Sequence, residues 1–150
     1  MRASAILPAG SWDESQAADR VMLDYESRYR RRVMLRTESG VELILDLPEA
    51  ARLRDGDGLV REDGGTVRVS AKPELLLEIQ APSVRDLLRV TWHLGNRHLP
   101  VQILADRVRV RDDHVIAGMV QGLGGHVNRI VAGFDPEAGA YAIAHHKHED

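Results

Sequence analysis

The pattern of hydrophobic residues changes at Ala71-Lys72-Pro73-Glu74, and this change most constrains the fold. Before it, short runs of apolar residues that alternate with polar ones are separated by turns rich in glycine. After it, apolar runs of strand length alternate with longer segments whose apolar residues recur at helical spacing. The proline also interrupts the preceding strand pattern. Because 150 residues are enough for two small domains, we expect a domain boundary near residue 72.

Residues 1–72 are expected to form a small all-β domain. Thr37-Glu38-Ser39-Gly40 lies between two β-type runs and is a hairpin signal. In the run that follows it, Val41, Leu43 and Leu45 alternate with more polar residues, as in a strand with one buried face. Short strands are predicted over residues 32–36, 41–46 and 66–70, with a further one at Ile6-Leu7.

Residues 73–143 are expected to form a ferredoxin-like domain with the element order β-α-β-β-α-β, which places the chain in the α+β class. Ser83 with Asp86 resembles a capping box that begins the first helix, and Asp113 is expected to cap the second. Residues 144–150 are expected to be a flexible tail. The predicted strands are residues 75–79, 101–104, 107–111 and 127–134. The predicted inward faces are Val84, Leu87, Leu88 and Thr91 in the first helix, and Val115, Met119, Val120 and Leu123 in the second.

The composition excludes several classes of protein. The chain has no cysteine, which rules out disulfides and thiolate metal ligands and is compatible with a reducing cytoplasm. Its formal charge of −3 gives no electrostatic basis for general nucleic-acid binding. No apolar run approaches the roughly 20 residues that a membrane span needs. We therefore expect a cytoplasmic protein that binds neither nucleic acid nor a membrane.

Motifs of nucleotide binding and catalysis are missing from the sequence. It contains neither a P-loop nor a GxGxxG pattern after a strand, and it lacks the GxSxG motif of hydrolases and the HExxH motif of zinc proteases. The carboxylate pair Asp112-Asp113 is better explained as a helix cap than as an acid–base pair. We expect a protein that is not an enzyme.

All seven histidines lie after residue 92, so any metal-binding residues belong to the second half. One of them, His98, lies at a corner of the chain. Gly95 is expected to end the first helix with a positive φ, and Leu99-Pro100 can begin a strand but cannot continue a helix. His93 lies five residues earlier, about 140° around a helix, so the two imidazoles do not share a face. The spacing alone leaves open whether His98 is a metal ligand or an ordinary surface histidine.

The segment His-Leu-Gly-Asn-Arg-His-Leu-Pro-Val-Gln-Ile, residues 93–103, resembles the signature of the UreE family, nickel metallochaperones that help to mature urease. Asp112-Asp113-His114-Val115-Ile116 and the C-terminal His145-His146-Lys147-His148 fit the same family. The resemblance extends from about Tyr25 onward. It implies a homodimer that receives Ni²⁺ and passes it to a nucleotide-hydrolysing accessory protein and the apo-urease complex. It also implies that the first half is a peptide-binding-like module that contacts the urease assembly.

With this resemblance, His98 is expected to be the principal metal ligand. A single imidazole is a poor chelate, and a twofold axis would bring two His98 side chains to one ion. Imidazole also suits Zn²⁺ and Cu²⁺, which would compete in vitro, so the choice of nickel comes from the resemblance. The further expected ligands are His93, Asp112 and His114 in a secondary site and His145, His146 and His148 in the tail. His126 is interpreted as structural or peripheral.

Two other functions stay open at this stage. The first half could bind a protein segment by strand addition, with the histidines incidental. The basic run from Ser27 to Arg32 could bind RNA, in which case RNA affinity would fall steeply with salt. Asp55-Gly56-Asp57 also resembles part of a calcium loop, but its flanks are predicted strands rather than the helices of an EF-hand.

Overall fold

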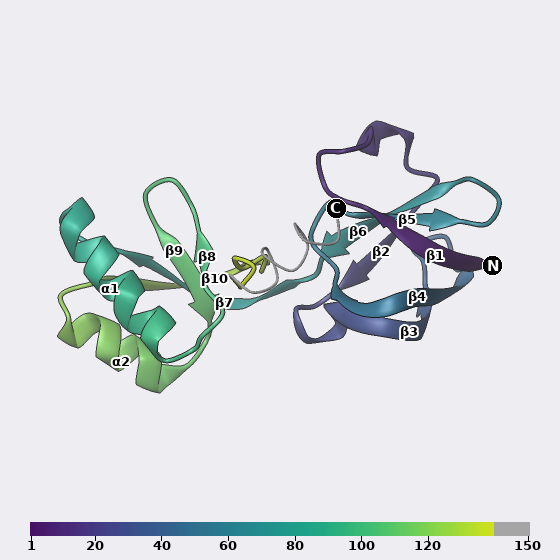
Figure 1. Cartoon of the computed structure of the whole chain (residues 1–150). Helices are drawn as coiled ribbons and strands as arrows, with labels where there is room; N and C mark the ends of the chain where they lie inside the picture. The colour runs from purple at the N-terminus through teal and green to yellow at the C-terminus, as the bar shows by residue number, and fades with distance from the viewer. Residues whose placement is uncertain (140–150) are drawn as a thin grey trace. The chain divides into compact units, whose positions relative to one another are not determined.

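The computed structural model describes residues 1–139, which form two compact units, Met1–Glu74 and the part of the chain from Leu75 onward. Each unit has a β-sheet of its own (Figure 1). Each also has its own cluster of buried hydrophobic side chains. The division between the units lies close to the change in sequence pattern at residue 72.

The first unit contains a six-stranded sheet with the strand order β2-β6-β5-β1-β4-β3. The pairs β1–β4 and β2–β6 are parallel, whereas β1–β5, β3–β4 and β5–β6 are antiparallel. This arrangement confirms a strand-rich first half. The elements are β1 (Arg2–Leu7), η1 (Glu14–Gln16), β2 (Asp19–Leu23), η2 (Glu26–Arg28), β3 (Tyr29–Arg36), β4 (Glu42–Arg52), β5 (Gly58–Arg61) and β6 (Thr66–Ala71).

The predicted hairpin between β3 and β4 is confirmed. Gly40 adopts a φ of +89°, and its N–H donates to the Thr37 carbonyl at 2.9 Å, which closes the turn. Leu43 and Leu45 are completely buried, as the alternation predicts. Val41 differs from the prediction: it lies outside the strand and is 37% exposed, because the turn takes up the residue before Glu42.

Much of the N-terminal strand structure was not predicted. β1 begins at Arg2 rather than at Ile6, and it lies inside the sheet between β5 and β4. β2 was missed entirely. Ala3 is the one buried residue of β1 and Val21 is the one buried residue of β2, so neither strand carries a repeated alternation of large apolar residues.

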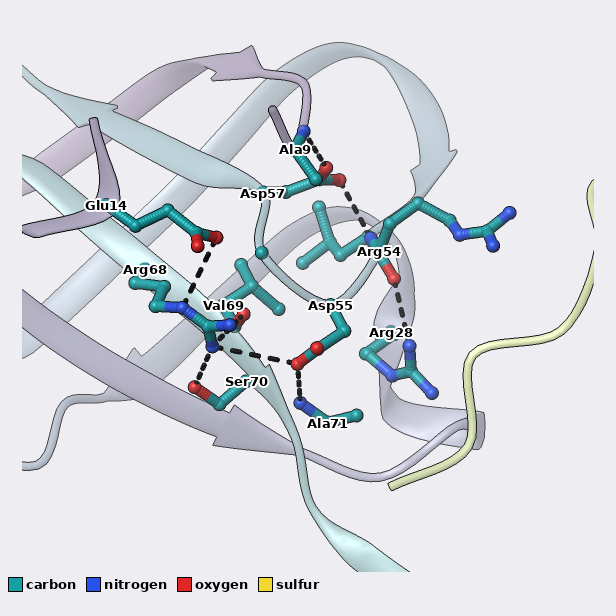
Figure 2. Close-up of polar contacts among 12 residues, drawn as sticks. Ala9, Glu14, Arg28, Arg54, Asp55, Asp57, Arg68, Val69, Ser70 and Ala71 are labelled. Carbon is teal, nitrogen blue, oxygen red and sulfur yellow. Dashed lines mark hydrogen bonds and ion pairs between the residues drawn. The ribbon is translucent and has the colours of Figure 1, made fainter. Parts of the chain in front are cut away.

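The turn at Asp55-Gly56-Asp57 uses its carboxylates to hold neighbouring backbone. Figure 2 shows Asp57 between two amides: its carboxylate accepts from the Ala9 N–H at 2.9 Å and from the Arg54 N–H at 2.7 Å. Asp55 accepts from the Ala71 N–H at 2.8 Å. Both carboxylates therefore have structural partners, which agrees with discounting a calcium loop here.

The basic run that begins at Ser27 does not form one exposed patch. Arg28 is completely buried, and its guanidinium donates to the carbonyls of Asp24 and Leu53 at 3.2 and 3.4 Å. It also lies 5.8 Å from the centre of the Tyr25 ring, within range of a cation–π contact. Arg28 is therefore a core residue of the first unit.

The second unit contains a four-stranded sheet with the strand order β10-β7-β9-β8 and two helices. In Figure 1, α1 and α2 lie together on one side of this sheet. The predicted order of elements, β-α-β-β-α-β, is confirmed. The elements are β7 (Pro73–Gln80), α1 (Val84–Asn96), β8 (Gln102–Ile103), β9 (Val108–Arg111), α2 (His114–Gly122) and β10 (His126–Gly133).

Both predicted helix caps are confirmed. The Ser83 hydroxyl accepts from the Asp86 N–H at 3.1 Å at the start of α1. The Asp113 carboxylate accepts from the N–H groups of Val115 and Ile116 at 2.8 and 3.2 Å at the start of α2. Such bonds satisfy amides that have no partner within the helix, so the side chains fix where each helix begins.

The predicted inward faces of the helices are partly wrong. In α1 the buried residues are Val90 and Leu94, whereas Val84 and Leu88 are exposed. Leu87 packs against the core as predicted. In α2, Ile116, Ala117 and Val120 are buried and Val115 is exposed. Both helices have apolar residues on more than one side, so helical spacing could not show which side faces the sheet.

The sheet of the second unit carries a buried ion-pair network around Glu78. This carboxylate is 8% exposed and accepts from Arg107 at 2.6 Å and from Arg109 at 2.9–3.0 Å. Burial alone would raise the pKa of the Glu78 carboxyl, but the bonds from the two arginines outweigh burial and hold this pKa below its usual range. The network ties β7 to β9 and the turn before it.

Candidate metal centre

The chain turns at His98 through a backbone conformation that histidine seldom adopts. α1 continues through Gly95, which was predicted to end it, and Arg97 is the residue at its C-cap. His98 then takes a φ of +60° and is the one non-glycine residue of the described 139 with a positive φ. Its N–H donates to the Gly95 carbonyl at 2.9 Å, and the Leu99 N–H donates to the Leu94 carbonyl at 3.4 Å. These two bonds form a Schellman motif with His98 in the left-handed position.

The end of α2 provides a direct comparison within the same domain. There the left-handed residue is Gly124, with a φ of +89°. The Gly124 N–H donates to the Gln121 carbonyl at 3.0 Å, and the Gly125 N–H donates to the Val120 carbonyl at 2.9 Å. The two helix ends share one hydrogen-bond pattern, but α2 has the glycine that this position favours and α1 has a histidine. A side chain in this conformation costs about 1–2 kcal/mol, so His98 stores strain.

The residues that flank His98 hold the corner in place. Leu94 is completely buried, and Leu99 packs against the same hydrophobic cluster. The imidazole of His98 itself is exposed. A buried residue on one side and an anchored residue on the other fix the backbone at His98, and the exposed ring is open to a ligand from outside.

The outer side of α1 carries an exposed apolar stripe that consists of Val84, Leu88 and Trp92. Their exposures are 76%, 65% and 64%, and their spacing of four residues places them along one side of the helix. Large apolar groups gathered on one exposed face are typical of an interaction surface. The stripe runs along the helix that ends at His98.

The residues of the predicted secondary site have different surroundings in the structure. The ring of His93 makes an edge contact with Trp92, with 5.0 Å between ring centres. Asp112 pairs with Arg129 at 3.1 Å, so its carboxylate already has a cationic partner. His114 is the exposed first residue of α2. Within residues 1–139, no three or more His, Cys, Asp or Glu side chains are grouped so that they could hold a metal ion.

The described chain ends close to the His98 corner. After β10, Phe134 is completely buried, and the Asp135 N–H donates to the side-chain oxygen of Gln102 at 3.2 Å. The Glu137 N–H then donates to the Val101 carbonyl at 2.8 Å, three residues after His98. The predicted tail ligands His145, His146 and His148 lie outside the described residues.

Comparison with models of protein families finds matches over both halves of the chain. A model of the N-terminal domain of the UreE urease accessory protein matches residues 3–72, and a model of its C-terminal domain matches residues 74–150. The chain belongs to the UreE family. The resemblance seen at residues 93–103 is confirmed, and the matched region begins well before Tyr25.

Individual relatives agree with this assignment. A urease accessory protein UreE from Bradyrhizobium sp. (strain ORS 278) is 51% identical over 148 residues, which cover 99% of this chain and 70% of the relative. The UreE protein of Beijerinckia indica is 45% identical over 150 residues, covering 100% and 86%. That of Rhodobacter capsulatus is 48% identical over 140 residues, covering 93% and 86%.

Family membership decides among the functions left open by the sequence. The UreE proteins are urease accessory proteins, so the prediction of an accessory protein rather than an enzyme is confirmed. A module without a role in urease maturation is not favoured. No helix within the described part of the chain is long and apolar enough to cross a membrane.

Proposed function

We propose that this UreE protein carries Ni²⁺ and delivers it to apo-urease during assembly of the urease metal centre. The observation that carries the proposal is His98: among residues 1–139 of this family member, the one non-glycine residue in a left-handed conformation is an exposed histidine. Strained residues persist where the surrounding fold fixes them, and they cluster at functional sites. Neutral imidazole is a good ligand for Ni²⁺, and it also accepts Zn²⁺ or Cu²⁺, which would compete in vitro.

In this proposal the carrier is a homodimer. A single His98 gives one ligand, whereas a twofold axis beside the corner supplies two identical ligands to one ion. The exposed stripe of Val84, Leu88 and Trp92 offers an apolar surface for that contact on the same helix. Two imidazoles leave several coordination positions open, so the ion is held but can still be transferred.

The other predicted ligands complete the proposal. His145, His146 and His148 would fill and vacate open positions at the His98 pair. The bond from the Glu137 N–H to the Val101 carbonyl, three residues after His98, supports this role. His93, Asp112 and His114 would form a weaker secondary site. For Asp112 to take part, its pair with Arg129 has to open.

Membership of the UreE family supports the proposed setting. The protein works in the cytoplasm, receives nickel, and passes it on together with a nucleotide-hydrolysing accessory protein bound to apo-urease. The first domain, residues 1–72, contacts that assembly as a peptide-binding-like module. For the second domain, residues 73–143, the element order and the strand order β10-β7-β9-β8 support a ferredoxin-like fold. Residues 144–150 would form the histidine-containing tail.

Equilibrium dialysis against nickel tests the metal site. We expect one tight Ni²⁺ per two chains, lost in His98→Ala and retained in His126→Ala, which removes an exposed imidazole from the start of β10. Retention of the tight site in His98→Ala would contradict the proposal.

Sedimentation velocity tests the dimer. Leu88→Asp places a charge in the exposed stripe and should yield monomers, whereas Val131→Asp, at an equally exposed apolar residue of β10, should not. A Leu88→Asp protein that sediments as a dimer would show that the stripe is not the dimer contact.

A further inference from the structure

The strand β3 ends the strand order of the six-stranded sheet in the first unit. Among the strands of residues 1–139, β4 is the one that pairs with it. An edge strand presents backbone N–H and C=O groups that can pair with a further chain. β3 is eight residues long, which is ample length for such a pairing.

The hydrogen bonds of β4 show which backbone groups of β3 face the open edge. In an antiparallel pair, residues that bond to the partner strand alternate with residues whose N–H and C=O point away from it. The Ile44 N–H donates to the Met1 carbonyl at 2.8 Å, on the side of β4 away from β3. Met34 lies directly opposite Ile44, so its own N–H and C=O point away from β4. The register is regular from Arg32 to Arg36, so these two residues present their backbone to the same edge.

The side chains of the same three residues lie on the outer face of the sheet. Leu35 is buried in the core, so its neighbours Met34 and Arg36 point to the opposite face, as does Arg32. Met34 is 59% exposed, and Ile44 beside it on β4 is 37% exposed. The outer face at this edge therefore has an apolar centre with an arginine on either side.

The charges of β3 are all of one sign, with four arginines and no acidic residue. Asp46 offers a single oxygen to two of the nearby guanidiniums, those of Arg32 at 3.4 Å and Arg2 at 3.1 Å. Arg36 pairs with Glu42 at 3.5 Å, yet its side chain is 71% exposed. An excess of positive charge thus remains at the edge.

This charge pattern selects the occupant. Like charges that lie directly opposite each other destabilise strand pairing, so a second copy of β3 is a poor partner, whereas a strand with carboxylates is a good one. The carboxylates of Glu42 and Asp46 and the apolar pair of Met34 and Ile44 do not suit a phosphate backbone. An acidic protein segment with an apolar residue fits both the charge and the apolar centre.

We propose that β3 binds an extended acidic segment of a partner protein by strand addition, and that this segment has the pattern acid-x-apolar-x-acid. Alternate residues of an added strand share one face. An apolar side chain opposite Met34 therefore brings carboxylates two residues before and after it to Arg32 and Arg36. Backbone hydrogen bonds supply affinity and the side chains supply specificity. The inference names the partner chemistry of the first domain, and it rests on the proposed function in placing this segment in the urease assembly.

Fluorescence anisotropy of a labelled peptide tests the specificity, with the full chain kept in chelator. The probe is Thr-Glu-Val-Leu-Val-Glu-Thr, and in the matched peptide Lys replaces both Glu. We expect the Glu peptide to bind about tenfold more tightly. Joint Arg32→Glu and Arg36→Glu should reverse this preference, whereas joint Arg85→Glu and Arg97→Glu, at exposed arginines of the second unit, should keep it. Equal binding of the two peptides, a preference that the first pair of substitutions leaves unreversed, or tighter binding of a single-stranded RNA would overturn the proposal.

Amide hydrogen exchange tests the geometry. The Glu peptide should slow exchange at Arg32, Met34 and Arg36, whose N–H groups face the edge. Val33 and Leu35 face β4, so their exchange should change little. Peptide binding without this alternation would overturn strand addition. Protection that rises with protein concentration in the absence of peptide would mean that a second copy fills the edge, and would also overturn it.

Binding to the urease assembly tests the link to the proposed function. Joint Arg32→Glu and Arg36→Glu should weaken this binding about tenfold while the protein retains one tight Ni²⁺ per two chains. Unchanged binding would overturn the assignment of the acidic segment to that assembly. Failure of the nickel function has a different signature, since His98→Ala would then keep its ion while the peptide preference, measured in chelator, persists.

Discussion

The strain at His98 predicts that removing the proposed ligand makes the metal-free protein more stable. In His98→Gly the left-handed residue no longer carries a side chain, which relieves about 1–2 kcal/mol. Glycine also gains freedom in the unfolded chain, which costs about 0.4–1 kcal/mol. The imidazole is exposed, so its loss removes little packing. The expected net gain is about 0.5–1 kcal/mol in the free energy of unfolding of the second domain.

The matched variant at the end of α2 should show the opposite sign. Gly124→Ala introduces a Cβ at a φ of +89°, and no atom outside the adjacent residues lies within 4 Å of that Cβ, so the cost is one of backbone conformation alone. We expect a loss of about 1 kcal/mol. His98→Ala keeps a Cβ at the strained position and should leave stability nearly unchanged.

Urea unfolding of the metal-free variants, followed by amide resonances of the second domain, measures these differences. With a urea m-value of about 1–3 kcal/mol/M, 1 kcal/mol corresponds to a shift of roughly 0.3–1 M in the midpoint, which is readily resolved. A His98→Gly protein less stable than the wild type would refute the strain argument, because it would mean that the imidazole makes contacts worth more than the backbone cost.

Three further variants test contacts within the individual domains. The lowered pKa of Glu78 means that its contribution to stability is present above its unfolded pKa of about 4.3 and is lost as pH falls through the folded value. Glu78→Gln should therefore flatten the acid limb of the melting temperature below about pH 5. Asp57→Ala leaves the amides of Ala9 and Arg54 without their acceptor and should cost the first domain about 2 kcal/mol in denaturant unfolding. Asp113→Ala removes the cap of α2 and should cost the second domain about 1 kcal/mol, with faster hydrogen exchange in the first turn of that helix.

Local hydrogen-bond chemistry was the most predictable part of this fold. Ser83 and Asp113 were recognised as caps because a short polar side chain before a helical pattern has one favourable use there. The glycine turn at Gly40 is predictable for the same reason. Such signals depend on a few neighbouring residues, and the structure confirms each of them.

Features set by contacts between distant residues were less predictable. Val84 and Leu88 were expected to face the core because they follow helical spacing, but Val90 and Leu94 also follow it, and only the sheet beneath α1 selects between the two sides. The central position of β1 depends on pairing with β4 and β5, which its own six residues do not encode. Tertiary contacts decide which helix face is buried and which strands pair, and a single sequence gives little information about those contacts.

The helix end at His98 was mispredicted for a reason that bears on function. Glycine is the residue that usually takes the left-handed position after a helix, so Gly95 was expected to turn the chain. Gly95 instead lies within α1, and the strain falls on the histidine. The rule that glycine takes the left-handed position reflects local stability. It fails at His98, the candidate ligand, where the proposed function needs an imidazole side chain in that position.

The same strain predicts that nickel reverses the order of stabilities. An ion that binds only the folded protein stabilises it by about 2.7 kcal/mol at a free concentration of 100 times the dissociation constant. This exceeds the gain of about 0.5–1 kcal/mol expected for His98→Gly in the absence of metal. The variant should therefore melt above the wild type in chelator and below it with saturating Ni²⁺, whereas Gly124→Ala should melt below the wild type in both. If the wild type gains no more from nickel than His98→Gly does, the left-handed imidazole is not a ligand, and its strain needs another explanation.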